Sequence, residues 1–170
     1  ENKSKTLTEG YKFLSHMLEN FSKHSLIDIK IEGDGDLQHH IIEDVAICMA
    51  EGLKKALGDK KGIKRFGSAF APMDEVLARV VVDISGRGYS NIELGLKLEE
   101  VDGLPVSLLN HFLTTFVKVS EIALHGKVLY GEDDHHKIEG FFKALALAIK
   151  QAVSIDERIK NIIPSTKGTI

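Results

Sequence analysis

The chain of 170 residues is 43% hydrophobic and 28% charged, which allows one ordinary domain, or two small halves that share a buried core. Its formal net charge of −3 and the lack of a long basic run argue against a nucleic-acid partner. Its apolar runs are too short to span a bilayer, and no signal segment opens the sequence, so we expect no membrane association and a cytoplasmic location.

The first part of the chain predicts two helices with a strand between them. The stretch "FLSHMLENFSKHSLIDIKI" (13–31) is typical of an amphipathic helix, with His16 near its start, followed by a strand. A loop then leads to "HHIIEDVAICMAEGLKKALGD" (39–59), which predicts a longer helix headed by two histidines.

The middle of the chain predicts strands. The alternation in "EVLARVVVDISGR", which follows "SAFAPMD", places Ala78, Val80, Val82 and Ile84 on one face of a strand. The stretch "SNIELGLKL" (90–98) predicts a further strand, ended by "EEVDGLP". These patterns indicate an α+β fold, with antiparallel sheets backed by helices.

The last part of the chain repeats the order of the first. The stretch "LLNHFLTTFVKVSEIALHG" (108–126) predicts a helix that carries His111 and then a strand, and "HHKIEGFFKALALAIKQAVSID" (135–156) predicts a helix headed by two histidines. Such matched order indicates an internal duplication within one domain, residues 1–170. The expected pseudo-repeats cover approximately 1–84 and 85–156, and an irregular tail covers 157–170.

Each repeat contains a His-His-x-x-Glu motif at the head of a helix. Because positions i and i+4 share a helix face, the first histidine of each motif faces the glutamate, and the second points about 100° away. The two histidines of one motif therefore cannot easily bind the same metal ion. Two facing motifs can supply two ions, each with a histidine and a glutamate from one copy and a histidine from the other. The motif residues are His39, His40, Glu43, His135, His136 and Glu139.

Two single histidines would complete these metal sites. His16 and His111 occupy equivalent places in the repeats, and His125 is the reserve candidate if His111 fails. The single Cys48 excludes an internal disulfide and a cysteine-based zinc cluster. Nitrogen and oxygen ligands with open positions suit Mn²⁺, with Fe²⁺, Co²⁺ or Zn²⁺ as competitors. Paired histidines can also simply begin helices, but two copies at equivalent places favour metal.

The sequence resembles the imidazoleglycerol-phosphate dehydratase family of histidine biosynthesis. The matching stretches run in family order across nearly the whole chain: "FLSHML", "HHIIEDVAI", "KKGIKRFG", "PMDEVLARVVVDISGR", "GEDDHHKIEGFFKALALAI" and "PSTKG". The resemblance implies a duplicated α+β fold of the ribosomal protein S5 domain 2-like type, each half a four-stranded sheet with two helices packed on one face. It also implies a homo-oligomer of twenty-four subunits built from trimers.

The resemblance implies a carbon–oxygen hydro-lyase with two Mn²⁺ per active site. The enzyme would dehydrate D-erythro-imidazole-glycerol phosphate to imidazole-acetol phosphate through a metal-bound imidazolate and a diazafulvene-like intermediate. The six motif residues would be catalytic. The family's metal ligands fall on His16, His39, His40, Glu43, His111, His135, His136 and Glu139.

The phosphate of this substrate needs cations and hydrogen-bond donors away from the metals. By resemblance, the substrate-binding residues are Arg65, Arg87, Lys143, Ser165 and Lys167. From the residues alone, "KKGIKR" is typical of a solvated loop and a terminal "STKG" of a frayed end.

The sequence departs from the family pattern at several places. Ser15 stands where an aspartate usually precedes the histidine, Gly88 replaces a usual proline, and the loop "GDGDLQHH" lacks the paired aspartates typical there. The sequence given starts after the strand whose glutamate the family uses in proton transfer. Two other functions therefore stay open: a binuclear metallohydrolase acting on a phosphorylated small molecule, and a catalytically impaired metal-linked assembly.

Overall fold

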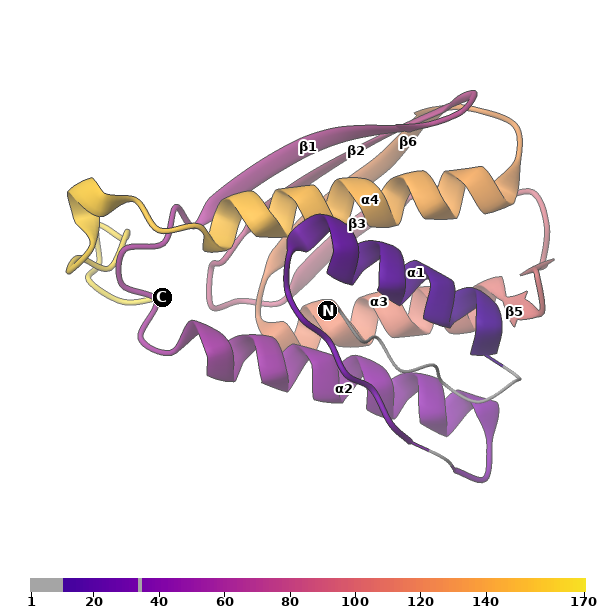
Figure 1. Ribbon diagram of the computed structural model, residues 1–170, viewed down its shortest axis with the longest axis horizontal. Coiled ribbons are helices and arrows are strands. Elements are labelled where there is room, and N and C mark those ends of the chain that lie inside the picture. Colours follow the sequence, from indigo (N-terminus) through magenta and orange to yellow (C-terminus); the bar gives the residue numbers. More distant parts are fainter. Residues whose placement is uncertain (1–10, 34) are drawn as a thin grey trace.

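Four strands form the sheet against which the helices are layered (Figure 1). The computed structural model describes residues 11–33 and 35–170. β1, β2 and β6 pair antiparallel, and β3 pairs parallel with β6. The α+β class predicted from the sequence is confirmed. In sheet order, the strands are β1 (Phe66–Met73), β2 (Val76–Asp83), β6 (Ala123–Tyr130) and β3 (Tyr89–Glu93).

One face of this sheet is buried by the alternation of apolar residues. Ala78, Val80 and Val82 on β2, together with Ile84 just beyond it, are each at most 1% exposed. This confirms the face predicted from the sequence. Burial of each valine or isoleucine contributes roughly 1.5–3 kcal/mol, so a one-residue slip of the strand would be strongly disfavoured.

Helix α4 (Asp134–Val153) lies very close to the buried face of the sheet. A Cβ atom at Gly67 of β1 would lie 1.9 Å from the Ala148 carbonyl oxygen. A Cβ atom at Gly126 of β6 would lie 2.3 Å from the Phe141 ring. A larger residue at Gly67 would push the helix backbone away, so these glycines fix the position of α4 and of the histidine pair at its head.

The other helices build a second layer on this core. Helix α1 packs against α4, and α2 packs against α3, which itself lies next to β3 (Figure 1). In the described ranges, no helix is long and apolar enough to cross a membrane. The remaining elements are α1 (Lys12–Ser25), α2 (Gln38–Leu57), α3 (Val106–Ser120), the hairpin strands β4 (Glu100–Val101) and β5 (Leu104–Pro105), and a short 3₁₀ helix (Glu157–Ile159) in the tail.

The strand predicted after the first helix does not form. Residues 27–33 have no regular secondary structure, and no described strand pairs with them. A strand needs a neighbour to satisfy its backbone N–H and C=O groups, so the apolar alternation of "IDIKI" is not sufficient. Within the described residues, a four-stranded sheet therefore forms once, from strands between 66 and 130. The expected repeat boundary after residue 84 falls between β2 and β3.

The strand predicted over 90–98 is shorter than expected. It ends at Glu93, and Gly95, with a φ of 62°, turns the chain toward the head of α4. There the Asp134 carboxylate accepts hydrogen bonds from the backbone N–H groups of Lys97 (2.6 Å) and Leu98 (2.8 Å). The Asp134 carboxylate thus satisfies two backbone N–H groups that a neighbouring strand would otherwise satisfy.

Asp134 also forms a buried ion pair that joins this loop to α4. Lys137 Nζ lies 2.8 Å from Asp134 Oδ1 and donates to the Gly95 carbonyl oxygen at 2.9 Å, and both charged side chains are at most 3% exposed. Burial raises the pKa of the Asp134 carboxyl, but hydrogen bonds from Lys137 and from the backbone N–H groups of Leu98 and Lys97 outweigh burial and hold that pKa below its ordinary value. The ionised pair therefore supports the first turn of α4.

We expect Asp134→Asn to destabilise the protein by about 3–5 kcal/mol, because it leaves the Lys137 ammonium buried without a counter-charge. Urea unfolding at pH 7 measures this loss. Because the folded-state pKa is lowered, the stabilisation is present above the unfolded pKa and is lost as the pH falls through the folded value, so the difference between wild type and variant should shrink in acid. Glu132→Gln, which breaks the exposed Lys97–Glu132 pair, is the control and should change stability little. An equal effect of both variants would contradict the argument.

Candidate metal centre

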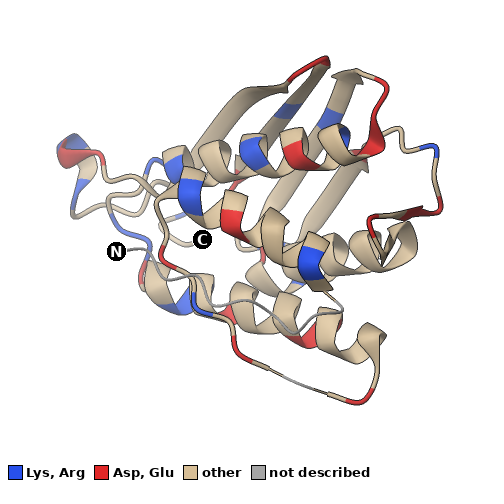
Figure 2. Ribbon diagram, turned by 45° about the vertical axis from the view of Figure 1, so that its right-hand side comes forward, with Lys and Arg blue, Asp and Glu red and all other residues tan. Residues whose placement is uncertain are grey.

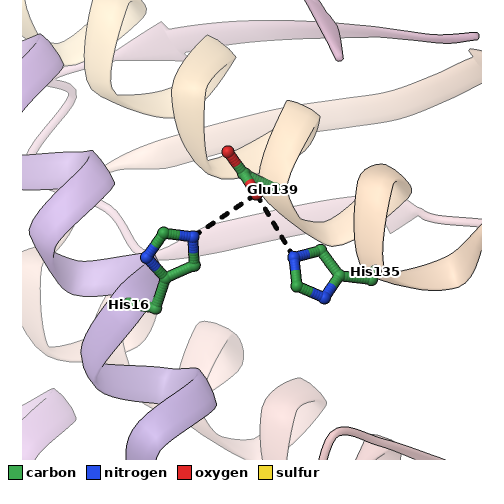
Figure 3. A group of neighbouring side chains, drawn as sticks. All are labelled: His16, His135 and Glu139. Atoms are coloured by element: carbon green, nitrogen blue, oxygen red, sulfur yellow. Dashed lines mark hydrogen bonds and ion pairs between the residues drawn. The ribbon is translucent and has the colours of Figure 1, made fainter. Parts of the chain in front are cut away.

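Glu139 gathers the first group of possible ligands (Figure 3). Its Oε2 atom lies 3.3 Å from His135 Nε2, one turn earlier on α4, and 3.5 Å from His16 Nε2 on α1. The Glu139 side chain is 9% exposed, and the three ligand atoms lie within 4.8 Å of one another. We call His16, His135 and Glu139 the Glu139 cluster.

A second group of the same composition lies between α2 and α3. His111 Nε2 lies 3.4 Å from Glu43 Oε1, and the rings of His39 and His111 stack with centroids 4.5 Å apart. His111 Nε2 is buried and makes no hydrogen bond to any described residue. We call His39, Glu43 and His111 the Glu43 cluster.

Each cluster combines the two repeats within one chain. The histidine and glutamate at positions i and i+4 come from one motif, and the third residue is the single histidine of the other repeat. This follows from the packing of α1 on α4 and of α2 on α3. His125 belongs to neither cluster, because it lies on β6 with its ring 5.5 Å from that of Tyr89.

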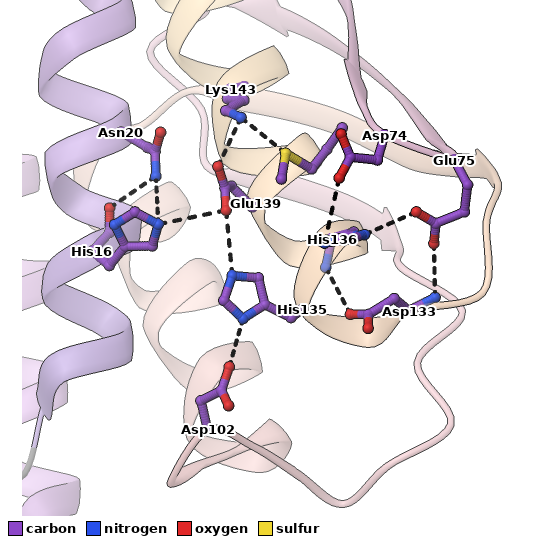
Figure 4. Close-up of polar contacts among 11 residues, drawn as sticks. His16, Asn20, Asp74, Glu75, Asp102, Asp133, His135, His136, Glu139 and Lys143 are labelled. Atoms are coloured by element: carbon purple, nitrogen blue, oxygen red, sulfur yellow. Dashed lines mark hydrogen bonds and ion pairs between the residues drawn. The ribbon is translucent and has the colours of Figure 1, made fainter.

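The second histidine of each motif points away from the clusters. The rings of His135 and His136 are nearly perpendicular, at 86°, and those of His39 and His40 differ by 80°. His136 Nδ1 lies 2.8 Å from Glu75 Oε2 in the β1–β2 turn (Figure 4). His40 Nδ1 lies 3.0 Å from Asp36 Oδ1 and has a side chain that is 54% exposed.

The two oxygens of Glu139 face different groups: Oε1 faces the Lys143 ammonium, and Oε2 faces the imidazole nitrogens with which it could bind a cation. Lys143 Nζ lies 2.7 Å from Oε1, whereas Oε2 faces the two histidines (Figure 4). Burial raises the pKa of the Glu139 carboxyl, but the hydrogen bond and charge of Lys143, followed by the charge of His16 and a hydrogen bond with His135, hold that pKa below its ordinary value. Glu139 is therefore an anion that can bind metal through Oε2.

The residues fit a divalent metal ion. Two imidazole nitrogens and one carboxylate oxygen converge in each cluster, a donor set that suits Mn²⁺, Fe²⁺, Co²⁺ or Zn²⁺ and leaves positions for further ligands. His111 Nε2 supports the same conclusion: it is buried and faces Glu43 Oε1 at 3.4 Å, yet it makes no hydrogen bond to a described residue, which is costly for a buried ring nitrogen.

The residues expected to bind phosphate do not all lie together in one chain. Arg65 N donates to the Ala152 carbonyl oxygen at 2.9 Å, near the end of α4. Ala152 follows Glu139 by 13 residues along α4, which corresponds to about 20 Å at a rise of 1.5 Å per residue. Lys143 lies near the Glu139 cluster, and Arg65, at the other end of α4, is far from it.

The C-terminal tail lies at the Arg65 end of the molecule. Arg65 Nη1 donates to the Pro164 carbonyl oxygen at 2.9 Å, and Nε donates to Asp83 at 2.7 Å, so this side chain ties the tail segment of Ser165 and Lys167 to the sheet. Arg87 follows the same end of β2. Figure 2 shows both basic and acidic residues in and around this tail, and acidic ones in the β1–β2 turn and the loop before α4.

Sequence reasoning missed several carboxylates that hold the histidines. Besides Glu75 and Asp36, these include Asp102, whose Oδ2 lies 2.5 Å from His135 Nδ1. The Asp-Gly dipeptide in "EEVDGLP" is a hairpin signal that predicts a turn there. It does not predict that the turn reaches a helix head 33 residues later in the chain.

The chain matches known proteins over most of its length. The family model for imidazoleglycerol-phosphate dehydratase matches residues 9–149. The imidazoleglycerol-phosphate dehydratases of Clostridium botulinum and Dehalococcoides mccartyi are 49% and 45% identical, each covering 95% of this chain and 83% or 82% of the relative. The structure of the Staphylococcus aureus enzyme matches with a TM-score of 0.84 and 36% identity over 92% of this chain and 90% of that chain. The Pyrococcus furiosus enzyme matches with a TM-score of 0.85 and 36% identity over 99% of this chain and 92% of that chain.

Proposed function

The chain belongs to the imidazoleglycerol-phosphate dehydratase family, and from this membership we propose which of its residues carry the family's reaction. The protein is a hydro-lyase of histidine biosynthesis that dehydrates imidazole-glycerol phosphate to imidazole-acetol phosphate. The observation that supports the residue assignment is the occurrence of two clusters of equal composition, each built from both repeats.

The two clusters hold two Mn²⁺ ions per active site. His16, His135 and Glu139 bind one ion, and His39, Glu43 and His111 bind the other. Bound metal supplies Lewis-acid polarisation of the substrate's imidazole ring and hydroxyl group. Lys143 keeps Glu139 ionised and directs Oε2 toward the histidines, and its remaining N–H is available to an anionic substrate.

The substrate's phosphate binds Arg65, Arg87, Ser165 and Lys167, with Lys143 contributing from the metal side. Arg65 supports this role because its φ of 69° places a non-glycine residue in the left-handed region, a strained conformation that often occurs at functional sites. All three of its guanidinium nitrogens already donate hydrogen bonds, Nε and Nη2 to Asp83 and Nη1 to the Pro164 carbonyl oxygen, so the guanidinium is held in place before substrate arrives.

The active site is shared between subunits. The three-carbon chain between imidazole and phosphate is much shorter than the roughly 20 Å from the Glu139 cluster to Arg65 within one chain. The metal end of one subunit must therefore meet the phosphate end of another. His40 and His136 point outward and complete metal shells across this interface, in a homo-oligomer of twenty-four subunits built from trimers.

A cytoplasmic location fits this substrate. A phosphate ester carries negative charge and does not cross a bilayer unaided, so the enzyme works in the compartment where the ester is made.

The metal-loaded protein should form imidazole-acetol phosphate from imidazole-glycerol phosphate, and EDTA should abolish this until Mn²⁺ is added back. His111→Ala should lower the rate at least a hundredfold, because it removes a ligand of the Glu43 cluster. Loss of activity in His125→Ala with retention in His111→Ala would refute the ligand assignment. Release of inorganic phosphate instead of dehydration would favour the metallohydrolase.

Arg65→Ala and Lys167→Ala should each raise KM about ten- to a hundredfold, because each lost charge-assisted bond costs on the order of 1.5–3 kcal/mol. Their metal content, measured by atomic emission, should stay unchanged. Lys160→Ala removes a tail cation that is paired with Glu157 and serves as the charge-matched control. Normal substrate binding in both test variants would place the phosphate elsewhere.

Chelation should split the assembly into small oligomers, and Mn²⁺ should restore it, because ligand binding across an interface stabilises the associated form. Light scattering and gel filtration measure the size. His40→Ala and His136→Ala should show the same defect with Mn²⁺ present, since these histidines face outward. If the particle size changes neither with metal nor with these substitutions, each metal site lies wholly within one subunit.

A further inference from the structure

Asp102 lies where it can control one of the two clusters. It occupies the tip of the β4–β5 hairpin with a φ of 47°, followed by Gly103 with a φ of 81°. Its Oδ2 atom lies 2.5 Å from His135 Nδ1, while His135 Nε2 lies 3.3 Å from Glu139 Oε2 (Figure 4). One imidazole ring is thus held between two carboxylates.

We infer that Asp102 is a positioning residue that fixes the protonation of Nδ1 and the orientation of His135. It thereby increases the affinity of the Glu139 cluster for its metal ion. The inference rests on the proposed metal-binding role of the Glu139 cluster. A carboxylate can only accept a hydrogen bond, so the contact with Asp102 places a proton on Nδ1. Without metal, Nε2 donates to Glu139 Oε2, and a metal ion would replace that proton on Nε2 while Nδ1 stays bonded to Asp102. A carboxylate behind a ligating histidine also raises the basicity of that histidine.

The hairpin is rigid enough to serve this purpose. Val101 and Leu104, on either side of its turn, are each 4% exposed, and the backbone N–H of Val106 donates to the Glu99 carbonyl oxygen at 2.9 Å. The Phe13 ring contacts His135 edge-on, with centroids 5.0 Å apart. The imidazole is therefore confined by the hairpin and by α1 before any metal binds.

Within the described part of the chain, the Glu43 cluster has no equivalent support. His39 stacks on His111 and receives no carboxylate there, because Asp36 bonds to the neighbouring His40. In the sequence, aligning His16 with His111 places Leu7 opposite Asp102. Loss of the Asp102 carboxylate should therefore affect one ion and leave the other unchanged.

The test is calorimetric titration of the metal-free protein with Mn²⁺ alone. Wild type should bind two ions per subunit. Asp102→Asn and Asp102→Ala should each weaken one of the two binding events about ten- to a hundredfold and leave the second unchanged. Glu100→Gln removes an exposed carboxylate of the same hairpin and is the matched control for a general change of charge.

A second readout is independent of metal. In the metal-free protein, long-range ¹H–¹⁵N correlation of the histidine side chains should show Nδ1 of His135 protonated in wild type, and a loss of that Nδ1 proton in Asp102→Ala, where only the Nε2 contact with Glu139 remains. Circular dichroism establishes that each variant is folded.

The outcomes separate the two proposals. If wild type binds no Mn²⁺, the metal-binding role of the clusters is wrong. If wild type binds two ions and both Asp102 variants do so with unchanged affinity, the role of Asp102 alone is wrong. Equal weakening of both ions, or an equal effect of Glu100→Gln, would likewise overturn the positioning role, because either result would show a non-local effect of charge.

Discussion

The packing of α1 against α4 and of α2 against α3 determines where every proposed metal ligand lies. Each cluster needs a histidine from one helix of such a pair and a histidine–glutamate turn from the other. The packing of α4 is in turn set by Gly67 and Gly126, where the sheet offers no side chain to keep the helix away. A change in the sheet remote from the ligands would therefore move His135 and Glu139 together relative to His16.

The length of α4 divides the proposed active site between its two ends. Glu139 lies in the second turn of this helix, and Arg65 is bonded to the backbone of its last turn. A rigid helix of this length cannot bring its two ends to one small substrate. Under the proposed assignment of the phosphate-binding residues, a second subunit therefore supplies the phosphate contacts, and assembly is a condition for catalysis.

Much of this could be predicted from the sequence because helical geometry is local. The i, i+4 relation of His135 and Glu139, and the outward direction of His136, follow from 3.6 residues per turn alone. The buried face of β2 followed from alternation. The strand expected after the first helix, within residues 13–31, was wrong because pairing depends on a neighbouring strand, which local sequence does not reveal. The exact boundary between the repeats stays a prediction.

The contacts that could not be predicted join distant parts of the chain. Asp102 reaches His135 across 33 residues, and Glu75 reaches His136 across 61. Both carboxylates sit in tight turns of hairpins, where a single residue determines the direction of a side chain. A carboxylate that hydrogen-bonds to a metal-binding histidine leaves a weaker sequence signal than the histidine itself. Any turn that brings a carboxylate to Nδ1 can make that hydrogen bond, so no fixed motif is required.

The two outward histidines are not free surface side chains. His136 is bonded to Glu75 and His40 to Asp36, in each case through Nδ1, and these hydrogen bonds raise the pKa of both imidazoles. Fixing an exposed side chain costs conformational entropy and gives little stability in water. With Nδ1 engaged, Nε2 is the remaining nitrogen of each ring, and in His136 it lies 3.8 Å from Asp74 Oδ2. This orientation fits the proposal that the two histidines bind metal at an interface between subunits.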